Sequence, residues 1–168
     1  MIHVCSLALL YETVEQTRAR HVVTLLKDTD RVIWPDGLAP ANHLILGMDD
    51  IAQPMDGYIH PADEHVTKLI DFARAWDRAT PMVVHCYAGI SRSTAGAFVA
   101  ACALNPARSE LAIAQEIRKA SATATPNPRI VSLADRALGR QGRMIAAIEK
   151  IGPGQMAYEG TPFRLDLE

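Results

Sequence analysis

Short apolar stretches alternate with helical patterns in the first half of the chain, and this alternation restricts the fold more than any other feature. The stretches are rich in Val, Ile and Leu, have the length of strands, and cover residues 2–10, 21–26, 43–48 and 82–85. A helical pattern at residues 12–20 separates the first two. Helices between short apolar strands indicate an α/β domain. We therefore predict a central, mostly parallel sheet flanked by helices on both faces, with an all-helical fold as the alternative.

The second half of the chain is predicted to be mainly helical. Pro61 occupies the first-turn position of an amphipathic helix, and Pro81 stops that helix. Residues 91–104 are small, apolar and rich in Ala, which is typical of a buried helix. Further helices are predicted at residues 109–120 and 128–150. Gly and Pro are frequent from about residue 152 onward, so we expect this tail to be irregular.

Length and charge limit the class of protein. The 168 residues suit a single domain with one core, spanning residues 1–168. A net charge of −2 gives no broad attraction to nucleic acid or to an anionic membrane, so neither is an expected partner. No apolar run approaches the roughly 18 residues that a membrane span needs. The apolar start, which is followed by charged Glu12, is expected to be a strand rather than a signal peptide.

The cysteine content favours a reducing compartment. Cys5, Cys86 and Cys102 form an odd and sparse set, which makes a poor disulfide framework. Free thiols are typical of reducing compartments, so we expect a cytoplasmic protein. On a continuous helix Cys102 would lie roughly 20 Å from Cys86, which makes it a poor partner for a disulfide. How near Cys5 lies to Cys86 is left open by the sequence.

Residues 83–93, Val-Val-His-Cys-Tyr-Ala-Gly-Ile-Ser-Arg-Ser, carry most of the chemical information. They predict a buried strand, a loop, and a helix that begins near Arg92. Backbone amides at the start of a helix are unpaired, and the helix dipole favours an anion there. A loop wrapped onto such a terminus directs several amides at one point, and Gly89 supplies the φ freedom that the curl requires. The predicted product is a nest for a tetrahedral oxyanion, formed by Tyr87, Ala88, Gly89, Ile90, Ser91 and Arg92.

Four side chains of this segment have predicted roles. In the field of the nest, Cys86 is expected to be ionised near neutral pH and to act as a nucleophile. The planar guanidinium of Arg92 suits two phosphate oxygens and the charge of a transition state. The hydroxyl of Ser93 is expected to donate to the sulfur and to help it leave, and His85 to orient the loop from beneath. A lone cysteine is usually buried and inert, but the surrounding pattern favours the catalytic interpretation here.

The pattern His-Cys-x-x-Gly-x-x-Arg-Ser resembles the signature of the cysteine-based protein tyrosine phosphatase superfamily. From His85 to Ser93 the sequence is most similar to the dual-specificity branch, and residues after Gly139 resemble small bacterial tyrosine-phosphatase-like proteins. Thr125-Pro126-Asn127 resembles the Pro-Asn turn that follows the signature loop in that branch, so Asn127 is expected to support the site. The resemblance covers roughly residues 44–138. It implies a phosphatase-type α/β fold with a strand, phosphate-binding loop and helix at the active site, a phosphocysteine intermediate, and no cofactor.

Cleavage of a phosphate ester also needs a proton for the leaving oxygen, which neither Cys86 nor Arg92 supplies. A carboxylic acid on a mobile loop would give this proton and then activate water. Members of the superfamily carry such an Asp after a short strand that precedes the cysteine. The candidates are Asp49, Asp50 and Asp56, and Asp50 matches the family position best. Asp56 is followed by Gly and also suits a turn.

The resemblance implies a phosphorylated protein or a small phosphoester as substrate. Tyr87, Ala88, Ile90 and Ser91 carry no charge, which disfavours inositol phosphates and phosphoinositides. Two alternatives stay open: a catalytically inactive module that binds phosphorylated partners, and another anion-cradling cysteine enzyme such as an arsenate reductase. The first would lack the cysteine, the arginine or the acid. The second fits less well with the His before Cys86 and the Ser after Arg92.

No metal site is predicted. His60, Glu64 and His65 lie close together, but their spacing matches neither a metalloprotease motif nor its inverse. Because Glu64 and His65 are adjacent, they would project from different faces of a helix. A solvated helix start explains this group better than a metal site does.

Overall fold

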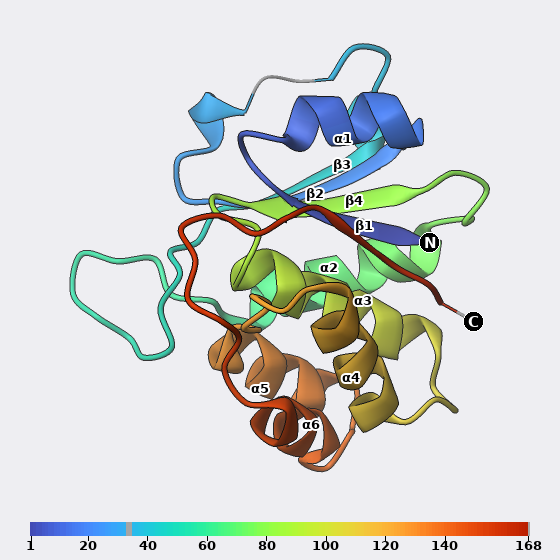
Figure 1. Ribbon diagram of the computed structural model, residues 1–168. Coiled ribbons are helices and arrows are strands. Elements are labelled where there is room, and N and C mark those ends of the chain that lie inside the picture. Colours follow the sequence, from blue (N-terminus) through green and yellow to red (C-terminus); the bar gives the residue numbers. More distant parts are fainter. Residues whose placement is uncertain (33–34, 168) are drawn as a thin grey trace.

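A computed structural model of the chain describes residues 1–32 and 35–167, which form three layers. One helix, α1, covers one face of a central sheet, and α2 to α6 lie on the other face (Figure 1). The strands are β1 (Ile2–Ser6), β2 (His21–Leu25), β3 (His43–Leu46), β4 (Met82–Cys86) and β5 (Phe163–Leu165). The helices are α1 (Leu10–Thr17), α2 (Asp63–Ala75), α3 (Arg92–Leu104), α4 (Glu110–Ala120), α5 (Pro128–Ala137) and α6 (Arg143–Ile151), with short 3-10 turns at Thr29–Arg31 and Pro40–Asn42.

The sheet has the strand order β3-β2-β4-β1-β5, and only the pairing of β1 with β5 is antiparallel. The predicted α/β fold with a mostly parallel central sheet is therefore confirmed. β4 lies in the middle and is buried along its whole length, as the continuous apolar run before His85 indicates. Because all the parallel strands end at one edge, β4 delivers Cys86 to the edge where ligands bind in such sheets.

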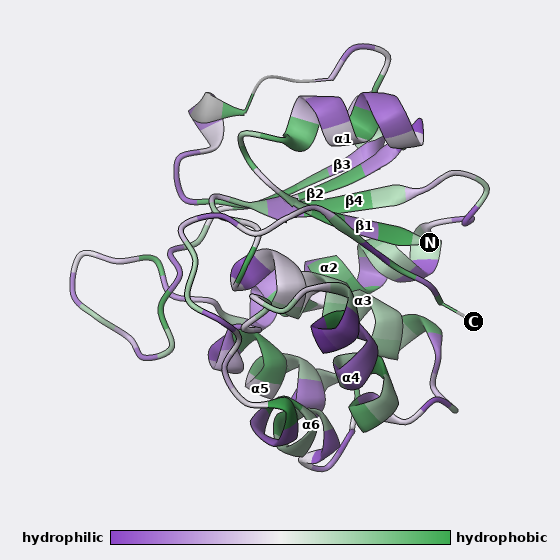
Figure 2. Ribbon diagram, in the orientation of Figure 1, coloured by the Kyte–Doolittle hydropathy of each residue, from purple (hydrophilic) through white to green (hydrophobic). Residues whose placement is uncertain are grey.

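Apolar side chains gather on both faces of the sheet. The larger core lies between the sheet and α2 to α6, and the smaller one lies under α1 (Figure 2). Nearly every residue of α3 is buried, which explains its small, Ala-rich composition. At Gly96 a Cβ atom would come within 2.8 Å of Leu25 Cδ1 and 3.1 Å of Val84 Cγ1. This close approach fixes the start of α3 against the strand that carries Cys86.

One prediction about the C-terminal third is wrong and another is incomplete. The single helix expected at residues 128–150 is divided into α5 and α6. Gly139 and Gly142 adopt φ values of +63° and +86° in the connection, a conformation that continues no helix. The carboxylate of Asp135 then accepts hydrogen bonds from the amides of Gly142 (2.7 Å) and Met144 (2.9 Å), which starts α6.

The tail expected to be irregular from about residue 152 contains the edge strand β5. Phe163 and Leu165 are buried and Arg164 between them is exposed, so the strand alternates as a half-buried strand should. This alternation was present in the sequence but is too short to stand out among glycines and prolines.

None of the helices within residues 1–32 and 35–167 combines the length and the apolarity that crossing a bilayer requires.

Candidate active site

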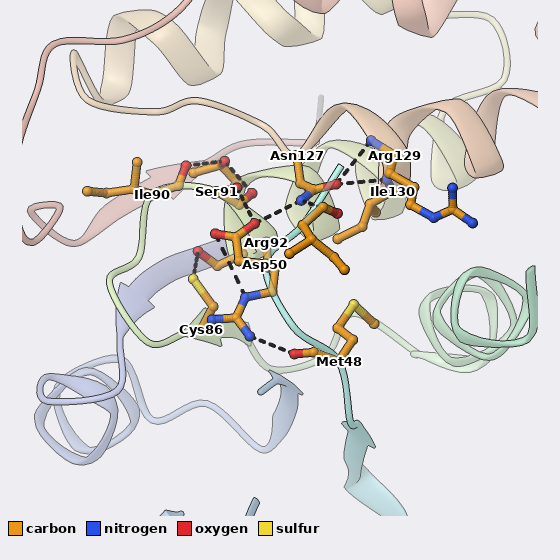
Figure 3. A network of polar contacts seen from close by, with 12 residues as sticks. Met48, Asp50, Cys86, Ile90, Ser91, Arg92, Asn127, Arg129 and Ile130 are labelled. Carbon is orange, nitrogen blue, oxygen red and sulfur yellow. Dashed lines mark hydrogen bonds and ion pairs between the residues drawn. The ribbon is translucent and has the colours of Figure 1, made fainter. Parts of the chain in front are cut away.

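Cys86 ends β4, and the chain then curls through residues 87–91 into the first turn of α3 at Arg92. We call residues 87–91 the nucleophile loop. Cys86 is 2% exposed, and its Sγ atom lies 3.1 Å from Ser93 Oγ in a hydrogen bond (Figure 3). The strand and the helix that hold the loop are both part of the core, so the sulfur has a fixed position at the base of the curl.

Four backbone carbonyls of the nucleophile loop accept hydrogen bonds from residues outside it. The amides of Leu7, Gly160, Thr125 and Asn127 donate to the carbonyls of Tyr87 (3.1 Å), Ala88 (2.8 Å), Ile90 (2.9 Å) and Ser91 (3.3 Å). In the described part of the chain, no acceptor takes the amides of residues 88–91. Since carbonyls and amides of a tight curl face opposite ways, the outward bonds turn the amides toward the interior of the loop. The nucleophile loop thus has the backbone arrangement of an anion nest next to Cys86.

Gly89 makes the curl possible. Its φ is +73°, and a Cβ atom there would lie 2.8 Å from both the carbonyl carbon of Cys5 and the amide nitrogen of Ser6. On the other side, buried Gly160 approaches the loop so closely that a Cβ atom there would lie 2.9 Å from the Gly89 carbonyl oxygen. The loop is therefore enclosed between the end of β1 and the segment before β5, and both contacts require glycine.

Arg92 lies at the start of α3 with its guanidinium turned toward the nest. It is 8% exposed, and its Nη1 donates to the carbonyl of Met48 at 2.7 Å (Figure 3). Its Nε lies 4.0 Å from Asp50 Oδ2 and, among the described residues, makes no hydrogen bond. A buried guanidinium with a free donor beside an anion nest is suited to binding oxyanions.

The three acid candidates lie in different surroundings. Asp50 Oδ1 accepts hydrogen bonds from Ser91 Oγ (2.7 Å) and Asn127 Nδ2 (2.8 Å), so its carboxylate meets the nucleophile loop. Asp49 Oδ2 accepts from the amide of Ile59 (2.7 Å) and lies 3.5 Å from Lys27 Nζ. Asp56 is exposed in the loop that follows Asp50. Of the three, only Asp50 is brought to the nucleophile loop in the described structure.

Asn127 connects three parts of the site. It is 3% exposed. Its backbone amide donates to the carbonyl of Ser91, and its side-chain Nδ2 donates to Asp50 Oδ1. Its Oδ1 accepts from the amides of Arg129 (3.0 Å) and Ile130 (3.1 Å) at the start of α5 (Figure 3). An Asn that caps a helix in this way is held rigidly. Asn127 therefore fixes the Asp50 carboxylate relative to the nucleophile loop.

A buried hydrogen-bonded chain lies beneath the loop. Thr24 Oγ1 lies 2.7 Å from His85 Nε2 and 2.7 Å from His43 Nε2. One hydroxyl has one hydrogen, so at least one of these ring nitrogens must donate. Burial lowers the pKa of both histidines to about 4, which keeps them neutral at physiological pH. Sequence reasoning missed Thr24 and His43, although each is a polar residue in a strand that is otherwise apolar.

The other two cysteines have surroundings different from those of Cys86. Cys5 pairs with His85 in the register between β1 and β4, so it faces the side of α1, whereas Cys86 belongs to the core on the opposite side. Cys5 and Cys102 are both buried, and burial raises the pKa of each thiol to about 12. In residues 1–32 and 35–167, no cluster of three or more His, Cys, Asp or Glu has an arrangement that would hold a metal ion.

The active-site cleft has a volume of about 150 Å³. Its lining residues come from the ends of β1 and β2, from the segment after β3 and from the nucleophile loop: Leu7, Leu26, Lys27, Asp28, Asp49, Asp50, Tyr87 and Arg92. Apart from Arg92, Lys27 is the one basic residue among these lining residues, and the carboxylates of Asp28, Asp49 and Asp50 offset its charge. The concentrated positive charge of the cleft is therefore at Arg92.

A strand, an anion nest over a cysteine, and an arginine at the start of the next helix define a cysteine-based phosphatase, and the sequence agrees. Residues 32–120, more than half of the chain, match the protein-tyrosine phosphatase family. The chain belongs to this family of cysteine-dependent hydrolases. No curated protein sequence is similar enough to be matched to it.

Solved structures share the fold at low sequence identity. Human DUSP28 is 19% identical with a TM-score of 0.62, covering 83% of this chain and 89% of that protein. PTPMT1 in complex with PI(5)P is 14% identical with a TM-score of 0.62, covering 90% and 95%. A human tyrosine phosphatase-like serine/threonine/tyrosine-interacting protein is 15% identical with a TM-score of 0.61, covering 83% and 92%. These likenesses show that the chain shares its fold with these proteins.

Proposed function

We propose that this phosphatase hydrolyses phosphate monoesters of proteins through a phosphocysteine intermediate on Cys86. The observation that supports it most is the nucleophile loop, whose carbonyls are bonded to residues outside it and whose amides at residues 88–91 have no acceptor in the described part of the chain. Such fixed dipoles stabilise a thiolate and then the equatorial oxygens of a transferring phosphoryl group. Arg92, with Nε free of hydrogen bonds among the described residues, takes part of the developing charge.

In the first step, the Cys86 thiolate attacks phosphorus and the bond to the leaving oxygen breaks. Asp50 gives its proton to that oxygen, so the leaving group departs as a neutral alcohol or phenol. The proposal assigns this role to Asp50 because its carboxylate lies against Ser91 and near Arg92, whereas Asp49 bonds to Ile59 and Lys27. Asn127 holds the carboxylate in place.

In the second step, water attacks the phosphocysteine and Asp50 accepts its proton. The bond between sulfur and phosphorus breaks, and inorganic phosphate leaves while the sulfur regains its electron pair. In the structure the Cys86 thiol donates to Ser93 Oγ at 3.1 Å. When the negative charge returns to the sulfur, the Ser93 hydroxyl turns and donates to it. The hydrogen bond thereby stabilises the leaving thiolate. His85 has no part in proton transfer in this scheme; with Thr24 it supports the base of the loop.

The substrates in this proposal are phosphotyrosine proteins, with phosphoserine and phosphothreonine proteins in the wider range of a dual-specificity enzyme. The solved PTPMT1 complex contains PI(5)P, so a phosphoinositide is the second candidate. The cleft of this chain favours the first, because Lys27 is paired with Asp49 at 3.5 Å and the nucleophile loop side chains are uncharged. A multiply charged inositol headgroup would need more cations than Arg92 alone.

We further propose that residues 1–168 form one catalytic domain that works in the cytoplasm. The five strands form one sheet, and helices cover both of its faces. All three cysteines are free and buried, as suits a reducing compartment. An inactive phospho-binding module would lack the nucleophile, the arginine or the acid, and candidates for all three meet here.

The test is hydrolysis of para-nitrophenyl phosphate by the purified protein in the presence of a chelator. We expect activity without added metal, inhibition by vanadate, and a loss of about a thousandfold or more in Cys86→Ser, because the hydroxyl is a far weaker nucleophile. Ser93→Ala is expected to slow the second step and to produce a burst of nitrophenol. Activity that survives Cys86→Ser, or that requires metal, would overturn the proposal.

A further inference from the structure

A groove leads from the active-site cleft along the nucleophile loop to the segment before β5. It has a volume of about 530 Å³, and its walls are Leu7 and Ala8 after β1, Tyr87 and Ala88 of the nucleophile loop, and Tyr158 and Glu159 near the C-terminal end. Leu7 and Tyr87 line both the groove and the cleft. The two spaces are therefore neighbours, and a substrate held at Cys86 reaches the groove if it is long enough.

The walls of the groove are held by the same bonds that shape the nest. Gly160 donates to Ala88 at 2.8 Å, which ties the segment bearing Tyr158 and Glu159 to the nucleophile loop. The amide of Leu7 donates to the carbonyl of Tyr87 at 3.1 Å, which joins the wall formed by Leu7 and Ala8 to the nucleophile loop. Figure 1 shows this segment running from α6 back to the sheet. The groove is thus a preformed feature of the site rather than a gap between independent loops.

The chemistry of the groove favours a cation. Tyr87 is 61% exposed and the Tyr158 side chain is fully exposed, so two aromatic rings face the solvent at its sides. Glu159 is exposed, and its Oε1 accepts a hydrogen bond of 2.5 Å from the buried hydroxyl of Ser6. In the described part of the chain Glu159 belongs to no ion pair. An oriented, unpaired carboxylate beside exposed aromatic rings suits the guanidinium or ammonium group of a basic side chain.

We propose that this groove binds the polypeptide next to the phosphorylated residue and selects substrates with arginine or lysine there. The inference rests on the proposed phosphatase function and narrows its substrates to basic phosphopeptide segments. The aliphatic stem of the basic residue lies along the rings of Tyr87 and Tyr158, and its charged end meets Glu159. A free phosphoester or a lipid headgroup has no side chain to place in the groove.

The experiment compares sets of phosphotyrosine peptides. Within each set, one flanking position carries arginine, alanine or glutamate, and the sets differ in which position, before or after the phosphotyrosine, is varied. The measurement is the ratio of kcat/KM between the arginine and alanine peptides. We expect at least one position where arginine is favoured about three- to fivefold, mainly through KM. Glu159→Gln and Tyr158→Ala each bring that ratio to about one, while Met156→Ala, an exposed neighbour outside the groove, keeps it.

The outcomes separate the two proposals. If para-nitrophenyl phosphate is not hydrolysed, the phosphatase mechanism fails, and the Kd values of the same peptides then test the groove. Equal Kd values for the arginine and alanine peptides at every position would overturn the groove proposal. If that ester is hydrolysed but arginine, alanine and glutamate peptides have equal kcat/KM at every position, the groove proposal is overturned. It is also overturned if arginine is favoured but Glu159→Gln and Tyr158→Ala leave the ratio unchanged, because the preference then arises elsewhere.

Discussion

The nucleophile loop and the Asp50 loop, residues 50–58, meet at one cleft but are held in different ways. Three segments distant in sequence donate hydrogen bonds to the carbonyls of the nucleophile loop. The Asp50 loop is fastened at its base, where Asp49 and Ile59 exchange two hydrogen bonds of 2.7 Å, and by the contacts of Asp50 itself. Residues 52–59 between these points are exposed, and this part projects from the body at the left of Figure 1.

The difference corresponds to two chemical tasks. Stabilising a transition state needs dipoles that do not reorganise, which the enclosed nucleophile loop provides. Protonating a leaving group requires an acid that meets esters of different shape, which suits a loop held at few points. Substitutions in the nucleophile loop should therefore lower kcat for all substrates alike. Substitutions in the Asp50 loop should lower kcat by an amount that depends on the leaving group.

Gly89→Ala should have the largest effect on this comparison. The new Cβ would meet the backbone of Cys5 and Ser6 at a φ of +73°, so the nest opens. We expect kcat to fall by about a hundred- to a thousandfold for aryl and alkyl phosphates alike. The matched control is Gly57→Ala in the Asp50 loop, where φ is +81° and no atom lies within 4 Å. Near-normal kcat in Gly89→Ala would show that the nest is not required.

Asp50→Asn should separate substrates by their leaving group. Nitrophenol leaves without help, so its ester should be hydrolysed at close to the normal rate, while an alkyl phosphate should lose about a hundredfold in kcat. Asp49→Asn and Asp56→Asn serve as controls, and each should change both rates only a few-fold. A leaving-group-dependent loss in either control, with none in Asp50→Asn, would transfer the role of acid to that residue.

The support beneath the nucleophile loop should make folding sensitive to acid. His43 and His85 have folded pKa values of about 4 against an ordinary 6.5, so the unfolded chain binds more protons between those values. Their contribution to stability is complete above pH 6.5 and is lost as the pH falls toward 4, at up to about 2.7 kcal/mol per pH unit for the pair. Urea unfolding across this range measures the slope. His43→Gln should reduce it by about half, and an unchanged slope would contradict the assignment.

The smallest effect is expected at the two other cysteines. Cys5 belongs to the core under α1, whereas Cys86 belongs to the core on the other face of the sheet, and Cys102 lies deep in α3, so we expect neither to form a disulfide with Cys86. After oxidation by peroxide, Cys5→Ser and Cys102→Ser should regain activity with dithiothreitol at the rate of the unaltered protein. Slower recovery in either variant would identify it as a thiol that resolves oxidised Cys86.

Much of the central architecture was predictable because it follows local patterns. The apolar runs gave the positions of β1 to β4, and the residues from His85 to Ser93 marked the strand, loop and helix that meet at the site. The protein-tyrosine phosphatase family was predicted correctly from the same residues. These features depend on composition over a few neighbouring positions, which one sequence displays directly.

The features that were missed depend on contacts between distant segments. Nothing in the three residues of β5 predicts that they pair with β1, since that pairing is decided by the edge left open in the sheet. Thr24 bonds to histidines on two other strands, and only the register of β2, β3 and β4 brings the three together. The division between α5 and α6 had a visible signal in Gly139 and Gly142, which the strong helical pattern around them outweighed.

The nucleophile loop receives bonds from Leu7, early in the sequence, and from Gly160, late in it. A polypeptide still emerging from the ribosome would already contain the reactive thiol but would lack the amide of Gly160 that fixes the curl. Such long-range closure forms late in folding. Catalytic activity should therefore arise only after the last strand has docked. Turnover then reports completed folding, and a partly folded chain does not hydrolyse phosphoesters.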